Sequence, residues 1–291
     1  MSQTTAQIAL PTAVSLETVI STTSPDHPTL IFIHFWGGSK RTWSRLITQL
    51  QNDYNIIAPS QRGWGDSAAP KDPKAYGITS YAEDIVALIQ HLQANKPELL
   101  TNGIILVGHS MGGKVAQYLV TEPEVACLLR GLILIAPAPS GSFSLPGEMR
   151  EQQVHAYDSL QSASFVVRNV LLGKPDAVDD NSVAQLAIDA VAGSPEARVA
   201  WPEYGMAEDY EDAVVDAVRN VRDQLRILVV VGELDRVETA ENIERRVVNV
   251  LKSAGAMTTV RVLGGIGHLI PVEAPEALAS AIREFIVQDV P

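Results

Sequence analysis

Residues 104–113 of the chain read I-I-L-V-G-H-S-M-G-G. Four apolar residues of strand length are followed by the pattern G-x-S-x-G, and a helical segment begins directly after it. The glycines of this pattern matter because a Cβ atom would obstruct the sharp turn and the close approach of strand and helix. The stretch therefore predicts a buried strand, a strained turn that presents Ser110, and a helix.

Further apolar runs of strand length lie on both sides of this stretch. They are rich in Ile, Val and Leu and continuous rather than alternating, which is typical of strands buried on both faces. The six runs lie at residues 30–33, 55–58, 104–107, 132–135, 227–231 and 260–263. Amphipathic helical patterns occur among them, for example at 81–92 and 275–287. This alternation predicts an α/β fold with a mainly parallel central sheet flanked by helices.

The alternation of strands and helices is interrupted between residues 140 and 222. No buried-strand run occurs there, and helical signals such as Ser194 followed by Pro195 dominate. We expect residues 140–222 to form an inserted helical cap on a core made of residues 1–139 and 223–291. Trp201 and Tyr204 are candidates for the wall of a substrate pocket, and packing within the cap is the alternative role for both.

Composition and charge exclude several classes of protein. The chain has 34 acidic and 22 basic residues, and the net charge of −12 would repel nucleic acid. The single cysteine, Cys127, excludes an intramolecular disulfide and is expected to be a small buried hydrophobic residue. No run approaches the roughly 20 apolar residues of a membrane span, and the N-terminus lacks a secretory signal pattern. We expect a soluble, cytoplasmic protein with neither a membrane nor a nucleic-acid partner; the oligomeric state does not follow from the sequence.

The order of these elements, together with G-H-S-M-G-G at residues 108–113, resembles the α/β-hydrolase superfamily and particularly its capped, esterase-like branch. The resemblance extends from about Leu30 over nearly all of the remaining chain. It implies that Ser110 is the nucleophile of a catalytic triad. A serine here argues against the haloalkane dehalogenase and epoxide hydrolase branches, which use an aspartate at this position.

The same resemblance implies where the other two triad members lie. The acid follows the strand after the cap, where G-E-L-D-R at 232–236 resembles the family's G-x-x-D turn, so Asp235 is the candidate and Glu233 the nearby alternative. The histidine lies after the last strand, in G-G-I-G-H-L at 264–269, and is His268. An imidazole can remove the serine proton near neutral pH, and the carboxylate would fix its tautomer.

Two backbone N–H groups that stabilise an oxyanion are implied in the same way. The first belongs to Met111, and the second to Trp36 in the loop H-F-W-G-G-S, which begins at His34 and resembles the family's H-G-x-x-G. Phe35 replaces the usual glycine and is expected to narrow the acyl pocket or shift the Trp36 amide. His34, Phe35 and His109 are expected to shape the substrate pocket rather than to take the proton.

These residues predict a serine hydrolase that cleaves a small, hydrophobic carboxylic ester or lactone through an acyl-enzyme on Ser110, without a cofactor. No H-x-x-x-H, C-x-x-C or carboxylate-rich calcium pattern occurs, so we expect no metal. Carbon–carbon bond hydrolysis, amide hydrolysis, perhydrolysis and cyanohydrin cleavage, as in hydroxynitrile lyases, remain alternatives on the same fold. A non-catalytic small-molecule receptor is a further alternative, although such receptors usually lack a triad member.

Overall fold

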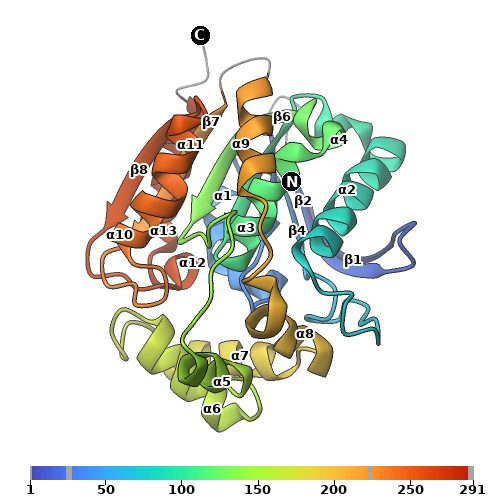
Figure 1. Ribbon diagram of the computed structural model, residues 1–291. Helices are drawn as coiled ribbons and strands as arrows, with labels where there is room; N and C mark the ends of the chain where they lie inside the picture. Colours follow the sequence, from blue (N-terminus) through green and yellow to red (C-terminus); the bar gives the residue numbers. More distant parts are fainter. Residues whose placement is uncertain (1, 24–27, 222–224, 288–291) are drawn as a thin grey trace.

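The computed structural model describes residues 2–23, 28–221 and 225–287 (Figure 1). These residues form one mixed sheet of eight strands in the order β1-β2-β4-β3-β5-β6-β7-β8. Strands β3 to β8 are parallel to one another, whereas β2 pairs antiparallel with both β1 and β4. The predicted α/β class with a mainly parallel central sheet is confirmed.

The strands are β1 (Ser2–Ala9), β2 (Ser15–Thr22), β3 (Thr29–Ile33), β4 (Asn55–Pro59), β5 (Ile104–His109), β6 (Leu129–Ile135), β7 (Arg226–Gly232) and β8 (Met257–Leu263). The α-helices are α1 (Ser44–Leu50), α2 (Ile78–Asn95), α3 (Met111–Tyr118), α4 (Pro123–Ala126), α5 (Gly147–Val154), α6 (Leu160–Val166), α7 (Asp180–Val191), α8 (Pro195–Ala200), α9 (Glu211–Asn220), α10 (Ala240–Ile243), α11 (Asn249–Ser253), α12 (Ile270–Glu273) and α13 (Pro275–Val287). Short 3-10 segments are η1 (Lys40–Trp43), η2 (Pro97–Leu100) and η3 (Leu119–Thr121), and π-helical segments are η4 (Val167–Leu171), η5 (Trp201–Gly205) and η6 (Glu244–Val248).

Strand β5 shows why the central strands are apolar throughout. Successive side chains of a strand point to opposite faces of the sheet. Ile104 and Leu106 pack in the cluster that includes α2 and α3, whereas Ile105 and Val107 pack in the cluster that includes α1 and α13. Both faces are covered by helices, so neither set of positions tolerates polar side chains.

Each of the six predicted strands is present, but the edges of the sheet differ from the prediction. Strand β8 is an edge strand rather than a strand buried on both faces, with Met257 and Val262 both more than half exposed. Strands β1 and β2 have no counterpart among the predicted strands. Strand β1 lies at the other edge, is mostly exposed, and mixes Ser, Thr and Gln with few apolar residues. Strand β2 is an inner strand whose buried residues include the polar side chains of Glu17, Thr18 and Ser21.

Cys127 lies at the end of α4, and the prediction that it is buried is wrong. The thiol is exposed, and its Sγ lies 3.3 Å from the carbonyl oxygen of Glu124 in the same short turn. Val125 is the residue of this turn that faces the core. One turn of helix can bury only one side, and Cys127 lies on the other.

Helices α5 to α8 gather below the sheet in Figure 1, at the end toward which the arrowheads of β6 and β8 point. We call residues 147–205 the cap segment. Helix α9 instead contacts α3 and α11, with Val214 and Val218 buried against the core. The division into core and cap remains a prediction, and the packing of α9 favours an end of the cap before Glu211 rather than at residue 222. None of the described helices is both long and apolar enough to cross a membrane.

Candidate active site

Ser110 lies in the turn between β5 and α3, with φ of 53° and ψ of −116°. A non-glycine residue in this region costs about 1–3 kcal/mol, so the surroundings must hold it. Its N–H donates to the carbonyl of Ile135 at 3.0 Å, and its carbonyl accepts from the N–H groups of Gly113 at 2.8 Å and Ala138 at 3.1 Å. The strained turn is therefore held by β6 and α3, which belong to the sheet and its covering helices.

The glycines of the turn allow its close packing. A Cβ atom at Gly112 would lie 2.2 Å from the carbonyl oxygen of Ile33, and one at Gly108 would lie 2.4 Å from that of Gly112. Both clashes involve backbone atoms, which cannot move aside without displacing β3 or α3. The turn has the geometry that the pattern G-x-S-x-G predicts.

His268 and Asp235 form a buried pair. The Nδ1 of His268 lies 2.8 Å from Oδ2 of Asp235, and the histidine is 2 % exposed. The other carboxylate oxygen, Oδ1, accepts from the N–H groups of Val237 at 2.8 Å and Glu238 at 3.0 Å. A carboxylate can only accept, so Nδ1 carries the hydrogen and Nε2 of the neutral imidazole is free to take a proton.

The alternative acid, Glu233, has a different role. It is exposed, and its Oε2 accepts the N–H of Gly265 at 2.7 Å, in the loop that carries His268. Between the two carboxylates, only that of Asp235 contacts the imidazole. The contacts therefore favour Asp235 as the acid and give Glu233 a part in holding the histidine loop.

The electrostatic surroundings of His268 favour its protonated form. Burial opposes the charge of the imidazolium, but the attraction of Asp235, with smaller contributions from Glu238 and Glu273, outweighs it and raises the pKa of His268. Glu238 is 7 % exposed, and burial raises its pKa to about 7. A second buried carboxyl group thus lies close enough to the triad to influence its charge.

The loop of His268 is held partly by the cap segment. The N–H of His268 donates to the carbonyl of Leu171 at 2.7 Å, at the end of η4. Glu273 accepts the N–H groups of Gly173 at 2.8 Å and Gly267 at 3.1 Å, and so ties the cap segment and the histidine loop together. The position of His268 therefore depends on how the cap segment is seated.

His109 and Phe35 lie beside His268, as buried neighbours. The Nε2 of His109 donates to the carbonyl of His268 at 2.8 Å, and the two rings are 5.2 Å apart. The ring of Phe35 lies 5.1 Å from that of His109 and packs among apolar residues of η4 and α7. Both residues shape the region around the base, with Phe35 turned toward the cap segment.

Ser110 and His268 are brought to the same region through His109, which precedes the serine and contacts the backbone of the histidine. Among the described residues, the Ser110 hydroxyl makes no hydrogen bond with the imidazole. Catalytic hydrogen bonds are often long without substrate and tighten in the complex. Ser110 is 8 % exposed, so little of it faces the solvent.

Trp36, the predicted second oxyanion donor, is fixed by the cap segment. Its indole Nε1 donates to the carbonyl of Arg198 at 3.0 Å, and its carbonyl accepts from the hydroxyl of Tyr157 at 3.2 Å. The Trp36 and Tyr157 rings are 4.2 Å apart. Within the described residues, the backbone N–H groups of Trp36 and Met111 donate to no other protein group, so both are available to an oxyanion.

His34 is wholly buried and holds the start of the loop that carries Trp36. Its Nδ1 donates to the carbonyl of Phe35 at 2.7 Å, and its Nε2 accepts the N–H of Gln61 at 2.9 Å. Burial lowers the pKa of His34 to about 4, so it is neutral near pH 7. These contacts favour a supporting role rather than direct contact with a substrate.

The contacts of Trp201 and Tyr204 do not include the triad. Trp201 is buried beside Phe143, with ring centroids 5.8 Å apart. The hydroxyl of Tyr204 donates to the carbonyl of Pro73 at 2.7 Å and accepts the N–H of Tyr76 at 3.2 Å. These contacts favour the packing role for both residues, and their assignment to the substrate pocket stays a prediction.

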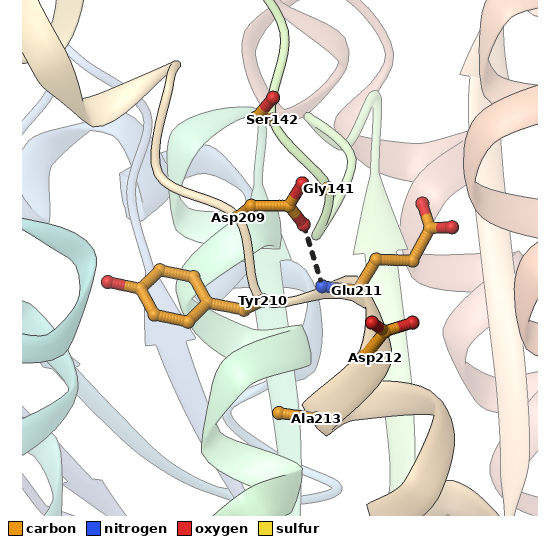
Figure 2. Close-up of a pocket in the computed structure, with 7 residues that line it drawn as sticks. All are labelled: Gly141, Ser142, Asp209, Tyr210, Glu211, Asp212 and Ala213. Atoms are coloured by element: carbon orange, nitrogen blue, oxygen red, sulfur yellow. Dashed lines mark hydrogen bonds between the residues drawn. The ribbon is translucent and has the colours of Figure 1, made fainter.

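A surface pocket of about 500 Å³ lies on the two linkers that join the cap segment to the sheet (Figure 2). It is lined by Gly141, Ser142 and residues 209–213, and contains none of the triad residues. Beside it, the buried Nζ of Lys114 donates to the carbonyls of Gly141 at 3.2 Å and Glu208 at 2.5 Å, one in each linker. Lys114 therefore fastens both ends of the cap segment to α3, and burial lowers its pKa to about 8.

Two buried carboxyl groups near the site, Glu238 and Asp189, have no place in the sequence prediction. Asp189 lies on the apolar side of α7 beside Leu186 and Ala190, and a charged residue within an apolar helical stripe was a signal that could have been used. Glu238 follows Asp235 by three residues in a loop, where the sequence has no periodicity that would indicate burial. The described residues contain no group of three or more His, Cys, Asp or Glu side chains able to hold a metal ion.

Comparison with known proteins gives consistent relatives. A model of the alpha/beta hydrolase family matches residues 30–281. A 3-oxoadipate enol-lactonase of Acinetobacter baylyi is 28% identical over 266 residues, covering 89% of this chain and 88% of that protein. A soluble epoxide hydrolase of Corynebacterium sp. is 23% identical over 287 residues, covering 88% and 89%.

Solved structures share the fold at low sequence identity. A bromoperoxidase from Bacillus anthracis superposes with a TM-score of 0.79 at 17% identity, covering 98% of this chain and all of that one. An esterase from Exiguobacterium antarcticum gives a TM-score of 0.78 at 19% identity, with the same coverage. Because the family model matches well over half of the sequence, the chain belongs to the alpha/beta hydrolase family.

Proposed function

We propose that this protein is a serine hydrolase that cleaves a small carboxylic ester or lactone through an acyl-enzyme on Ser110. The observation that carries the proposal is the buried pair of His268 and Asp235, 2.8 Å apart, next to the strained turn that presents Ser110. A serine hydroxyl is a weak nucleophile until a neighbouring base removes its proton. Nδ1 of His268 is engaged with the carboxylate, which leaves Nε2 as that base.

In the acylation step, Oγ of Ser110 attacks the carbonyl carbon while its proton passes to Nε2 of His268. Asp235 remains ionised and stabilises the imidazolium. The developing oxyanion accepts the free N–H groups of Met111 and Trp36. When the tetrahedral intermediate collapses, the carbon–oxygen bond breaks and the leaving oxygen takes the proton from the imidazolium.

In the deacylation step, a water molecule gives its proton to His268 and attacks the acyl carbon. Collapse of the second tetrahedral intermediate breaks the bond to Oγ, and the proton returns to the serine. In a lactone, the leaving hydroxyl group stays attached to the acyl chain, so one ring-opened product is released. The cycle consumes one water and needs no cofactor.

The class of bond is proposed from the nucleophile and from the relatives. The enol-lactonase is named for a lactone and matches this chain over nearly its whole length. The epoxide hydrolase relative is similar in extent, but the epoxide hydrolase branch uses an aspartate where this chain has Ser110. Phe35 and the apolar residues around it favour a substrate with a small hydrophobic acyl group.

The test is labelling with a fluorophosphonate followed by peptide mapping, run beside hydrolysis of short-chain p-nitrophenyl esters and of simple aliphatic and aromatic lactones. We expect one label per chain, on Ser110, and turnover that Ser110→Ala abolishes. Lactone opening, followed as acid release at constant pH, separates lactonase from esterase preference.

If folded protein is neither labelled nor active, the proposal is overturned, and the alternative of a non-catalytic small-molecule receptor is favoured. Labelling without ester or lactone turnover would support the serine nucleophile but indicate a different reaction, such as hydrolysis of an amide or of a carbon–carbon bond. Labelling at another residue would overturn the assignment of Ser110.

A further inference from the structure

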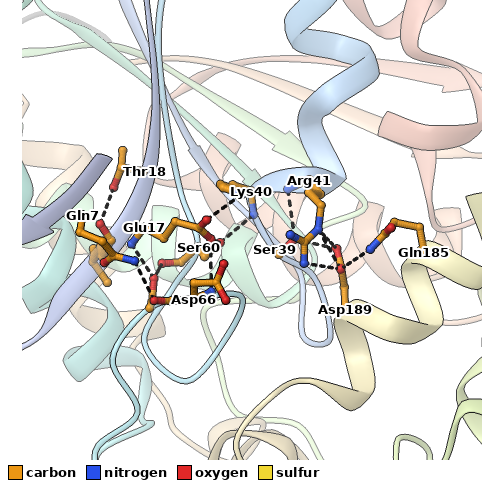
Figure 3. Close-up of polar contacts among 12 residues, drawn as sticks. Gln7, Glu17, Thr18, Ser39, Lys40, Arg41, Ser60, Asp66, Gln185 and Asp189 are labelled. Atoms are coloured by element: carbon orange, nitrogen blue, oxygen red, sulfur yellow. Dashed lines mark hydrogen bonds and ion pairs between the residues drawn. The ribbon is translucent and has the colours of Figure 1, made fainter. Parts of the chain in front are cut away.

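A buried carboxylate of the cap segment binds directly to the loop that carries Trp36. Asp189 of α7 is 2 % exposed and accepts the hydroxyl of Ser39 at 2.7 Å and Nη2 of Arg41 at 2.6 Å. Nε of Arg41 lies 2.9 Å away, and Nε2 of Gln185 completes the set at 2.9 Å. Figure 3 shows these side chains converging on the Asp189 carboxylate. Asp189 lies 150 positions after Ser39 in the sequence.

Ser39 is the end of the oxyanion loop as well as the partner of Asp189. It directly follows Gly37 and Gly38, and its Oγ accepts the N–H of Arg41 at 3.1 Å as the N-cap of η1. Its hydroxyl hydrogen points to Asp189, so one side chain links the loop, the start of η1 and the cap segment. The backbone of residues 36–39 is thereby placed relative to α7.

The opposite side of the same segment is fixed to the core. Nζ of Lys40 lies 2.9 Å from Oε1 of Glu17, and the N–H of Lys40 donates to Oγ of Ser60 at 3.1 Å (Figure 3). These contacts hold the polypeptide after the loop, whereas those of Asp189 hold the loop end itself. Removing Asp189 would leave η1 anchored and release the side of the loop toward Trp36.

The chemistry of the Asp189 contact suits orientation more than stability. Only Asp189 is buried in this ion pair, and the Arg41 side chain is 38 % exposed, so solvent screening and the desolvation of Asp189 leave little net stabilisation. The Asp189 carboxylate, however, accepts hydrogen bonds from two nitrogens of one guanidinium and from one hydroxyl. Hydrogen bonds of this kind are strongly directional. Such a set fixes geometry to within a few tenths of an ångström, the accuracy that an oxyanion donor requires.

We propose that Asp189 is a positioning residue: its carboxylate ties Ser39 to α7, so that the Trp36 N–H reaches its catalytic place only when the cap segment is docked. The proposal rests on the proposed function, because it assigns the Trp36 N–H to the oxyanion. Asp189 itself does not touch the substrate. Its loss lowers the stabilisation of the transition state rather than the binding of the ester.

The chain offers a matched control on the same helix. At the other end of α7, Asp179 accepts Nη2 of Arg45 at 3.0 Å, so this pair also joins the cap segment to the core. It is exposed and lies away from the oxyanion loop, on α1. Arg45→Gln therefore removes this contact between cap segment and core, together with the bonds of Arg45 to Ser182 and to the carbonyl of Val272, without touching the loop.

The experiment compares Asp189→Asn with Arg45→Gln, with kcat expressed per serine titrated by the fluorophosphonate. For Asp189→Asn we expect kcat for p-nitrophenyl butyrate to fall roughly 10- to 100-fold with KM within about 3-fold, since misplacing a catalytic group by about 1 Å costs up to about 100-fold. The affinity for butylboronic acid, an analogue of the tetrahedral intermediate, should fall by the same factor. Arg45→Gln should change each quantity less than about 2-fold.

A purely structural role of Asp189 would lower the melting temperature and the fraction of titratable serine but leave kcat per titrated serine and boronate affinity unchanged; that result would overturn the proposal. If Asp189→Asn does not fold, Ser39→Ala removes the hydroxyl contact with Asp189 together with the N-cap of η1, and keeps the contacts of Asp189 with Arg41. It should still lower kcat per serine by roughly 3- to 10-fold, and no decrease would equally overturn the proposal. Wild-type protein that neither labels nor turns over would instead refute the proposed function.

Discussion

The turn that presents Ser110 and the loop that presents Trp36 lie in one site but are held by different parts of the molecule. The backbone of Ser110 is bonded to Ile135 and Ala138 at the end of β6 and to Gly113 of α3. The loop of Trp36 is bonded to Tyr157, Arg198 and Asp189, all of which belong to the cap segment. The sheet and its helices therefore hold the proposed nucleophile, and the cap segment holds the loop of the proposed second oxyanion donor.

The pair of His268 and Asp235 is held by both parts of the molecule. Asp235 is held by backbone N–H groups of its own loop, whereas the backbone of His268 is bonded to Leu171 of the cap segment. A substrate that enters by displacing the cap segment would thus meet a formed nucleophile without a complete oxyanion site. On the proposed mechanism, the second oxyanion donor would be in place only once the cap segment is seated.

The largest effect is expected from a change to the proposed triad itself, which leaves both the serine turn and the Trp36 loop in place. Asp235→Asn should lower kcat by about 10³- to 10⁴-fold, because an amide directed at Nδ1 favours the wrong imidazole tautomer. Ester hydrolysis per folded protein measures it, with circular dichroism to establish the fold. Glu233→Gln, which changes the rival carboxylate, should stay within roughly 3-fold of wild type, because Glu233 only supports the loop at Gly265. Equal losses in both variants would contradict the assignment of Asp235.

Two glycine substitutions distinguish the core-held turn from the cap-held loop. Gly112→Ala places a Cβ 2.2 Å from the backbone of Ile33, so we expect a loss of several kcal/mol of stability or no folded protein. Gly37→Ala meets the ring of Tyr157 at 2.5 Å and a φ of 91°, but that ring belongs to the cap segment and can move. The Gly37 variant should fold and lose about 10- to 100-fold in kcat.

Thermal unfolding and kcat per titrated serine measure both variants. Should Gly37→Ala destabilise the protein as much as Gly112→Ala, the oxyanion loop would be as integral to the core as the serine turn. The comparison between the two regions would then fail.

The buried carboxyl group of Glu238 allows a test through pH. Its pKa is raised from 4.5 to about 7, so the neutral acid is favoured in the folded state and ionisation costs about 3 kcal/mol. The cost is absent below about pH 4.5, grows between pH 4.5 and 7, and is complete above pH 7. Glu238→Gln should therefore be about as stable as wild type at pH 5 and more stable at pH 8, by about 3–6 °C in melting temperature.

Exposed Glu244 supplies the control for this measurement. Glu244→Gln should show no difference from wild type that grows with pH. A melting temperature of Glu238→Gln that tracks wild type from pH 5 to pH 8 would mean that water or Lys114 and Arg246 fully compensate the charge. The same variant should lower the pKa of His268, because it removes a negative charge that favours the imidazolium.

The serine turn could be predicted from the sequence because its constraints are local. Gly108, Ser110 and Gly112 are close neighbours in the sequence, and the apolar run before them is buried on both faces of the sheet. Strand β1 escapes the same reasoning because a polar edge strand has no continuous apolar run. Strand β2 escapes it because polar residues such as Thr18 and Ser21 are buried among its apolar ones. The exposure of β8 has the same origin: composition does not distinguish an edge from a centre.

The cap-held half of the site could not be read in this way. Ser39 and Asp189 are about 150 residues apart, and the sequence offers a lone acid in an apolar stripe but no indication of its partner. The role of Trp36 follows from the resemblance of its loop to a family loop, and the residues of that loop do not indicate that Tyr157 and Arg198 bind it. Contacts between distant segments depend on how the cap segment is seated, which local patterns do not determine.

The smallest expected effect concerns a single hydroxyl group of the cap segment. Tyr157→Phe removes the hydrogen bond of 3.2 Å to the carbonyl of Trp36 but keeps the ring contact, 4.2 Å between centroids. One neutral hydrogen bond contributes about 1 kcal/mol, so kcat per titrated serine should fall about 2- to 5-fold. Tyr76→Phe is the matched control, since its hydroxyl donates to Pro70 at 2.7 Å, accepts from Ser194 of the cap segment at 3.2 Å, and makes no hydrogen bond to the Trp36 peptide. If both variants lose activity equally, the effect reflects a general loosening of the protein. If only Tyr157→Phe loses activity, this single hydrogen bond from the cap segment helps to orient the Trp36 peptide.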